Sequence, residues 1–152
     1  MIVADTCAWI EVLVGGELGR RFMPYLEDRH NLIVPTLVQA ELRKWALRER
    51  DEDFANQVIA STRAAALVEP LTESIALAAA DHGVIDGLSI ADAIIYATAR
   101  FHNAELITSD AHFAALPGVR YLEKKNGRAA TMKIAKANDK KTKAEKKLVI
   151  KK

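Results

Sequence analysis

Four acidic residues are the strongest candidates for chemistry in this sequence. Asp5 follows a short apolar run at residues 1–4, and Asp110 comes shortly after the run at residues 106–108. Asp92 lies near the start of an almost wholly apolar stretch, and Glu41 is flanked by apolar residues in a segment with helical spacing. Since the carboxyl ends of parallel strands meet at one edge of a sheet, we expect these four side chains to gather at that edge.

A group of carboxylates of this kind favours metal chemistry. No basic residue is adjacent in sequence to Asp5, Asp92 or Asp110, so the charges would repel one another by several kcal/mol unless a divalent cation neutralised them. Oxygen ligands suit Mg²⁺ or Mn²⁺. Either ion can bridge a phosphate and activate a water molecule, which is the usual route to phosphodiester cleavage without a covalent intermediate.

Each acidic residue also has an ordinary structural explanation. The Asp92 carboxylate could cap the start of its own helix, and Glu41 could be a solvated surface residue. Asp5 and Asp110 could close turns in loops, where Asp is common. The metal site is favoured because four residues, rather than one, are placed for it.

Short apolar runs alternate with helical patterns along the chain, which predicts an α/β fold with a central parallel sheet covered by helices on both faces. The expected strands are residues 1–4, 32–34, 66–70, 105–110 and 118–123, the last at an edge. The expected helices are residues 7–16, 36–50, 51–63, 72–83, 89–103 and 112–116. We expect Thr36 and Ser89 to cap helices, and Gly83 to lie just past a helix end.

Composition indicates one ordinary globular domain: the chain has 152 residues, 50% of them hydrophobic and 28% charged. Cys7 is the only cysteine, which excludes an intramolecular disulfide and a cysteine-based zinc site. No stretch approaches the roughly 20 apolar residues that span a membrane, and the N-terminus lacks the pattern of a signal peptide. We expect a cytoplasmic protein that does not bind a membrane.

Charge is distributed unevenly along the chain. Residues 124–152 hold 12 of the 22 basic residues and two of the 20 acidic ones, without a sustained apolar face. We expect this segment to be a mostly disordered basic tail that follows a domain at residues 1–123. A solvated tail that binds nothing is one possibility, and binding of RNA phosphates is the other. The candidate residues for such binding are Lys124, Lys125, Arg128, Lys140 and Lys141.

Four stretches, taken in order, resemble the PIN-domain ribonucleases, and specifically the VapC-type toxins of toxin–antitoxin pairs. They cover residues 1 to about 122 and are "IVADTCAWIEVL", "IVPTLVQAELRKW", "GLSIADAIIYATA" and "LITSDAHF". No single stretch is specific, but the four in order are. The basic tail lies outside the resemblance.

The resemblance implies a fold, an activity and partners. The fold would be a three-layer α/β/α PIN-like fold with a parallel sheet of four to five strands. The protein would be a Mg²⁺-dependent endoribonuclease toxin, neutralised by a small antitoxin protein and forming a homodimer. The residues that would hold the metal are Asp5, Glu41, Asp92 and Asp110, with support from the hydroxyls of Thr6 and Thr108. The family often has Ser where Cys7 stands, which weakens a supporting role at that position.

Other features have ordinary explanations. The histidines lack metal-binding spacing, and only His112 lies near a candidate residue. Trp9 and Trp45 follow apolar helical stripes, as core or interface residues do. The segment 36–50 combines apolar and basic side chains in a surface suited to binding another chain. Its members are Leu42, Arg43, Lys44, Trp45, Leu47, Arg48 and Arg50.

Three other functions use a similar arrangement. A non-catalytic RNA- or protein-binding module of the same fold would keep the carboxylates for structure and use the basic tail for binding. A phosphoacceptor receiver domain needs further acidic residues before its Asp and a later Lys. A haloacid-dehalogenase phosphatase needs a second Asp two residues after Asp5, where Cys7 stands.

Overall fold

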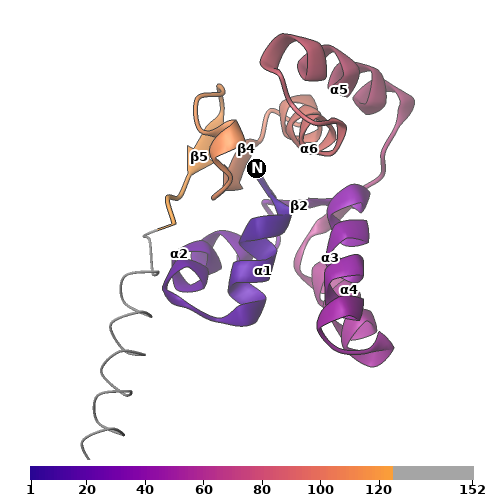
Figure 1. Ribbon diagram of the computed structural model, residues 1–152, viewed down its shortest axis with the longest axis vertical. Helices are drawn as coiled ribbons and strands as arrows, with labels where there is room; N and C mark the ends of the chain where they lie inside the picture. Colours follow the sequence, from indigo (N-terminus) through magenta and orange to yellow (C-terminus); the bar gives the residue numbers. More distant parts are fainter. Residues whose placement is uncertain (125–152) are drawn as a thin grey trace, which may run out of the picture.

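A five-stranded parallel sheet with the order β3-β2-β1-β4-β5 forms the centre of the computed structural model, which describes residues 1–124 (Figure 1). The strands are β1 (Ile2–Ala4), β2 (Leu32–Pro35), β3 (Leu67–Glu69), β4 (Glu105–Thr108) and β5 (Val119–Tyr121). Apart from Glu105 and Thr108 in β4, the three central strands are apolar, and they are almost entirely buried, as strands covered on both faces must be. The predicted α/β class and the edge position of the last strand are confirmed.

Helices cover both faces of the sheet. They are α1 (Thr6–Val14), α2 (Glu17–Leu26), α3 (Thr36–Glu49), α4 (Glu52–Ala65), α5 (Glu73–Asp86), α6 (Ile90–Phe101) and the short 3₁₀ helix η1 (Ala111–Phe113). In Figure 1, α5 and α6 lie above the strands and α1 to α4 lie below them. The molecule therefore has the three layers, α/β/α, that the sequence predicted.

The direction of the chain across the sheet reverses at β1. From β1 the chain passes through α1 and α2 to β2 on one side, whereas α5 and α6 carry it back to β4 on the other side. Asp5 extends the pairing of β1 with β4, because its backbone N–H donates to the carbonyl oxygen of Ile107 at 3.1 Å. In open α/β sheets such a switch point is where binding sites form, at the carboxyl ends of the strands.

The helix α6 buries more residues than any other helix in the described part of the chain. Its buried residues are Ala93, Ile95, Tyr96, Ala97, Thr98 and Ala99. The hydroxyl oxygen of Ser89 accepts a hydrogen bond from the backbone N–H of Asp92 at 3.2 Å, so Ser89 caps the helix as predicted. This cap fixes the first turn of α6, which holds Asp92.

The structure contains a helix, α2, that the sequence analysis did not predict. Two glycines precede it, Pro24 lies inside it, and Gly19 lies on its buried face, so its helix propensity is low although its sequence is amphipathic. Gly19 is needed where it is, because a Cβ atom there would lie 2.2 Å from the carbonyl oxygen of Glu11 in α1. The buried side chains of Phe22 and Leu26 then anchor α2 in the core.

Two expected helix ends are wrong. Pro35, not Thr36, is the residue that precedes α3, and the Thr36 hydroxyl accepts a hydrogen bond from the backbone N–H of Leu71 at 3.2 Å. The helix α5 continues through Gly83 and ends at Asp86, where the next residue, Gly87, has a positive φ of 68°. Helix packing therefore overrides the local preference of Gly83, and the left-handed conformation falls at the next glycine.

Residues 125–152 lie outside the described part of the chain. The predicted basic tail, with Lys125, Arg128, Lys140 and Lys141, therefore remains a prediction. Lys124 is described, and its Nζ lies 3.1 Å from a carboxylate oxygen of Glu11.

No single helix among the described residues is long and apolar enough to span a membrane. Only α5 and α6 taken together meet that test by length and composition, and they are bent by 114° at the break between them.

Candidate active site

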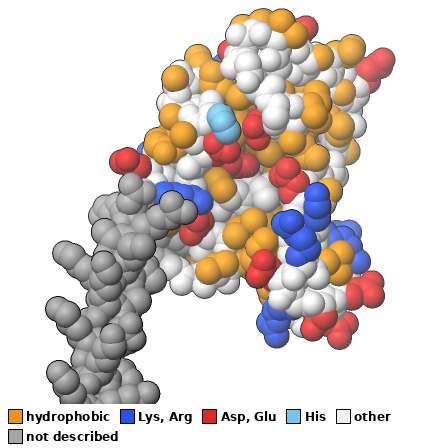
Figure 2. Space-filling model, viewed as in Figure 1, with side chains coloured by type: hydrophobic (Ala, Val, Ile, Leu, Met, Phe, Trp, Pro, Cys, Tyr) orange, Lys and Arg blue, Asp and Glu red, His pale blue; other side chains and the backbone are white. Residues whose placement is uncertain are grey.

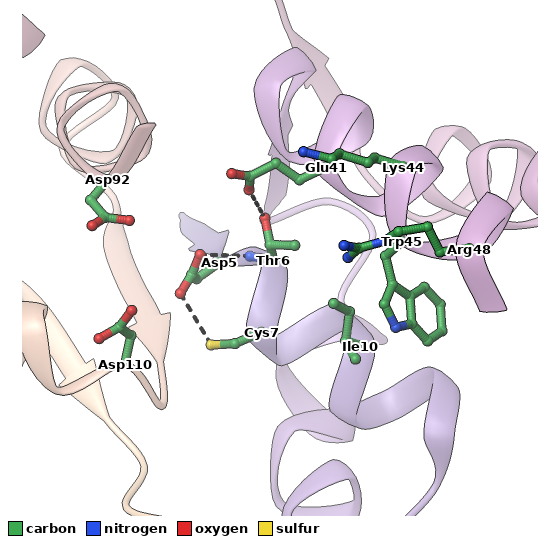
Figure 3. A pocket seen from close by; sticks show the side chains of 10 residues that line it. All are labelled: Asp5, Thr6, Cys7, Ile10, Glu41, Lys44, Trp45, Arg48, Asp92 and Asp110. Carbon is green, nitrogen blue, oxygen red and sulfur yellow. Dashed lines mark hydrogen bonds between the residues drawn. The ribbon is translucent and has the colours of Figure 1, made fainter. Parts of the chain in front are cut away.

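A cavity of about 390 Å³ lies at the carboxyl ends of β1 and β4 (Figure 3). All four acidic residues singled out from the sequence line it: Asp5, Glu41, Asp92 and Asp110. They come from four separate segments, since Asp5 follows β1, Glu41 lies on α3, Asp92 on α6 and Asp110 after β4. The fold thus brings together residues that are up to 105 positions apart in the sequence.

Asp5 is the most enclosed of the four, with 6% of its surface exposed. Its Oδ1 accepts a hydrogen bond from the backbone N–H of Thr6 at 2.7 Å. Its Oδ2 accepts one from the hydroxyl of Thr108 at 2.7 Å and one from the thiol of Cys7 at 3.1 Å. Burial raises the pKa of Asp5 above its ordinary value, although these three hydrogen bonds oppose the change.

Glu41 is held by Thr6. The Thr6 hydroxyl donates a hydrogen bond to Oε2 of Glu41, while the Thr6 backbone N–H donates to Oδ1 of Asp5. Burial raises the pKa of Glu41, the charges of Asp5 and Asp92 raise it further, and the bond from Thr6 and the charge of Lys44 lower it. Thr6 alone therefore donates hydrogen bonds to two of the four carboxylates, Asp5 and Glu41.

Asp92 lies in the first turn of α6, half-buried, with its side chain facing the cavity (Figure 3). Ser89 provides the cap of that helix, so the explanation of Asp92 as a capping residue does not apply. Among the described residues, none donates a hydrogen bond to the Asp92 carboxylate. A half-buried carboxylate without a donor is suited to a ligand that brings positive charge.

Asp110 has both a local and a cavity-facing role. Its Oδ1 accepts a hydrogen bond from the backbone N–H of His112 at 2.9 Å, which closes the turn into η1. The ring Nδ1 of His112 lies 3.0 Å from the same oxygen. The turn-closing explanation is therefore correct for Asp110, and the same carboxylate also lines the cavity.

Two further residues connect the ends of β1 and β4. Thr108 is fully buried; its hydroxyl donates to Asp5 and accepts from the backbone N–H of Asp110 at 2.9 Å. The sulfur of Cys7 accepts from the backbone N–H of Ser109 at 3.3 Å. Burial raises the pKa of the Cys7 thiol to about 11, so at neutral pH it is a neutral group that can donate to Asp5. The thiol therefore contacts the carboxylate of Asp5 directly, and because a thiol is a weak donor, the weakened supporting role expected at Cys7 stays a prediction.

The opposite wall of the cavity is basic, and the sequence analysis did not assign it to the site. Lys44 and Arg48 of α3 line the cavity together with Trp45 and Ile10. The spacing of Glu41, Lys44, Trp45 and Arg48 puts them on one face of a helix, which is the signal that could have found them. Figure 2 shows acidic side chains near the centre of this face of the molecule and basic ones beside them, over α3 and α4.

The mixed surface predicted on this helix needs one correction. Leu42 is fully buried in the core, whereas Leu47 is 45% exposed. Trp45 is half-buried, and its ring centroid lies 6.0 Å from that of Phe54 in an edge-to-face contact. Trp9 is a core residue, in agreement with its apolar stripe.

The arrangement supplies oxygen ligands from several directions to one space. The ligand type suits a hard divalent cation. As the side chains lie, no three His, Cys, Asp or Glu residues within 1–124 are close enough together to hold a metal ion. Four like charges repel one another, so a cation would have to draw two or more of these carboxylates together.

The chain matches a known protein family and several solved structures. The family model described as "PIN domain" matches residues 2–119. A toxin–antitoxin complex from Klebsiella pneumoniae is 23% identical, with a TM-score of 0.69 over 82% of this chain and 100% of that chain. No curated protein sequence matches significantly.

Two further solved structures share the fold. The sarcin-ricin loop cleaving toxin VapC20 from Mycobacterium tuberculosis is 20% identical, with a TM-score of 0.62 over 82% of this chain and 98% of that chain. VapBC-1 from nontypeable Haemophilus influenzae is 22% identical, with a TM-score of 0.61 over 81% and 98%. At such identities the similarity establishes the fold.

Proposed function

The chain belongs to the PIN domain family, and from this membership and the geometry of the cavity we propose that it is a metal-dependent endoribonuclease, the toxin of a toxin–antitoxin pair. The observation that carries the proposal is the convergence of Asp5, Glu41, Asp92 and Asp110, from four separate segments, on one cavity. A structural role alone does not explain why the fold places four carboxylates at its switch point, where each raises the cost of keeping the others ionised.

The four carboxylates would hold Mg²⁺ or Mn²⁺. Their oxygens fit such an ion by type, and Asp92 has its carboxylate free of hydrogen bonds from the described residues. The bound ion would supply an activated water molecule and would neutralise charge on the phosphate. Hydrolysis of the phosphodiester bond of RNA is the reaction that this chemistry supports.

Uncharged groups of the protein, three side chains and one backbone N–H, would orient the ligands. Thr108 and Cys7 donate to one oxygen of Asp5, the Thr6 backbone N–H donates to the other, and the Thr6 hydroxyl donates to Glu41. These contacts support Thr6 and Thr108 as supporting residues and add Cys7 to them. Residues that hold ligands in this way commonly change metal affinity by about 10- to 100-fold when they are replaced.

The partners belong to the proposal as well. The toxin–antitoxin complexes among the similar structures support a cognate antitoxin for this chain. An RNA substrate, a homodimer and a cytoplasmic location complete the proposal. RNA binding by the basic tail remains a separate prediction, because most of the tail lies outside the described residues.

Incubation of the full-length protein with total RNA tests the proposal. With Mg²⁺ we expect discrete cut ends, and with EDTA intact RNA. Asp92→Asn should leave the RNA intact, whereas Asp53→Asn, at an exposed position in the first turn of α4, should cleave as the wild type does. A non-catalytic binding module would bind RNA and leave it intact under all these conditions, which would refute the proposal.

A further inference from the structure

Two basic side chains, Lys44 and Arg48, enter the cavity from the same wall. They lie one helical turn apart on α3, which separates them by about 6 Å along the helix axis. Both line the cavity, and Figure 3 shows their charged ends directed toward the space that Glu41 and the other carboxylates surround. The two positive charges therefore lie beside the four carboxylates and not among them.

Both side chains have their charge available for a ligand. Within residues 1–124, no acidic group forms an ion pair with Lys44 or Arg48, and both residues are exposed. Arg43 on the same helix behaves differently, because its guanidinium donates to Asn56 at 2.8 Å and lies 3.4 Å from Glu52. Lys44 acts on Glu41 only through its charge, which lowers the pKa of that carboxyl.

An RNA strand would meet an unfavourable potential at four carboxylates. A cation between them would offset part of that charge, but the phosphates on either side of the reacting one would still face acidic side chains. Basic groups that bind these neighbouring phosphates would compensate for the repulsion. Arginine can bind a phosphate through two parallel hydrogen bonds, and lysine can act beside it as a point charge.

We propose that Lys44 and Arg48 form a phosphate-binding pair that holds the RNA backbone next to the phosphodiester presented to the carboxylates. This inference rests on the proposed function and names residues that bind the substrate of the same site. The pair contacts phosphates rather than bases, so it contributes affinity without selecting the sequence that is cut.

The aromatic residue between them packs against the next helix. Trp45 is half-buried, and its ring makes an edge-to-face contact with Phe54 of α4, whose ring also lies 4.9 Å from the guanidinium carbon of Arg50. This contact holds the side chain of Trp45 between Lys44 and Arg48 on the cavity wall.

RNA binding in the absence of cleavage tests the pair. The full-length protein carries Asp92→Asn to prevent cleavage, and a single-stranded RNA oligonucleotide labelled at one end is titrated at several salt concentrations with Mg²⁺ present. We compare Lys44→Gln, Arg48→Gln and the double variant with Arg43→Gln, which removes one positive charge from the same helix outside the cavity. The basic tail is identical in all variants, so differences report on α3.

We expect Lys44→Gln and Arg48→Gln each to weaken binding several-fold, and each to reduce the slope of log affinity against log salt by about 0.7. Arg43→Gln should change both quantities less. Equal affinities and slopes for all four variants would overturn the inference.

The outcome is distinct from that of the proposed function. Wild-type protein that binds RNA through Lys44 and Arg48 but never cleaves it with Mg²⁺ would refute the nuclease and retain the phosphate-binding pair. In a cleaving protein, the positions of the cut ends should be the same in Lys44→Gln and the wild type. A changed cut site in Lys44→Gln would show that the residue reads bases, which contradicts a pair that binds phosphates alone.

Discussion

The hydroxyl of Thr108 lies 2.7 Å from Oδ2 of Asp5, so the end of β4 holds the carboxylate that follows β1. The same hydroxyl oxygen accepts from the backbone N–H of Asp110. One buried threonine thus connects the carboxylate of Asp5 with the backbone of Asp110, across the two strands that border the switch point. Its replacement should affect both the stability of the fold and the site.

Thr108→Val should lower the free energy of unfolding by about 1–3 kcal/mol, because it removes one of three hydrogen bonds to the buried carboxylate of Asp5 and the hydroxyl partner of the Asp110 backbone N–H. The pKa of Asp5 should rise further, since the bond from Thr108 lowers it. Urea denaturation measures the first effect. Thr98→Val is the matched control: Thr98 is also buried, but its hydroxyl donates within its own helix to the carbonyl oxygen of Ile94. Equal losses in the two variants would contradict the role of Thr108.

Asp92→Asn should abolish RNA cleavage while leaving the melting temperature unchanged or higher. The substitution removes one of four repelling charges and breaks no hydrogen bond to the carboxylate within the described residues. Asp53→Asn provides the control for the loss of a charge in the first turn of a helix, which costs about 0.3–1 kcal/mol. The melting temperature of Asp92→Asn should therefore be higher than that of Asp53→Asn. Full cleavage by folded Asp92→Asn would contradict the catalytic assignment.

The positions of the four carboxylates could be predicted because each depends on a local signal. Asp5 and Asp110 come just after short apolar strands, and Asp92 follows the capping residue Ser89. The basic wall was missed because Lys44 and Arg48 also fit an exposed surface that binds another chain. Only the relative placement of α3 and β1 shows that these side chains share a cavity with Asp5, and that placement depends on packing over long distances in the sequence.

The free energy of unfolding should depend on pH through the titration of Glu41. Burial raises its pKa above the ordinary value of 4.5, so the folded state binds the proton more tightly than the unfolded chain does. The associated stabilisation is fully present below about pH 4.5 and is lost as the pH rises through the raised pKa. In EDTA, the free energy of unfolding of the wild type should fall across this window.

The free energy of unfolding of Glu41→Gln should fall less steeply across the same pH window, because a glutamine side chain does not titrate. Asp5 also has a raised pKa and should preserve part of the dependence. Glu49→Gln, at an exposed position near the end of α3, is the control and should follow the wild type. Urea denaturation at a series of pH values measures all three proteins. Identical profiles for Glu41→Gln and the wild type would contradict the burial argument.

Expression of the chain without a partner should arrest bacterial growth, and Asp5→Ala should lift the arrest. Because Asp5→Ala also removes three hydrogen bonds to a buried carboxylate, Asp92→Asn serves as a second inactive variant with an intact fold. Growth curves at matched protein levels, checked by immunoblot, provide the measurement. Unimpaired growth with abundant wild-type protein would argue against a toxin.

Binding of Mn²⁺ to the full-length protein, followed by the electron paramagnetic resonance signal of the free ion, tests the central claim without requiring knowledge of the RNA. The wild type should bind Mn²⁺ saturably. Asp92→Asn and Asp110→Asn should each weaken binding by at least about tenfold, Glu41→Gln should have a milder effect, and Asp53→Asn should have none. Absence of saturable binding, or equal affinity in Asp92→Asn and Asp53→Asn, would contradict a metal site at the four carboxylates.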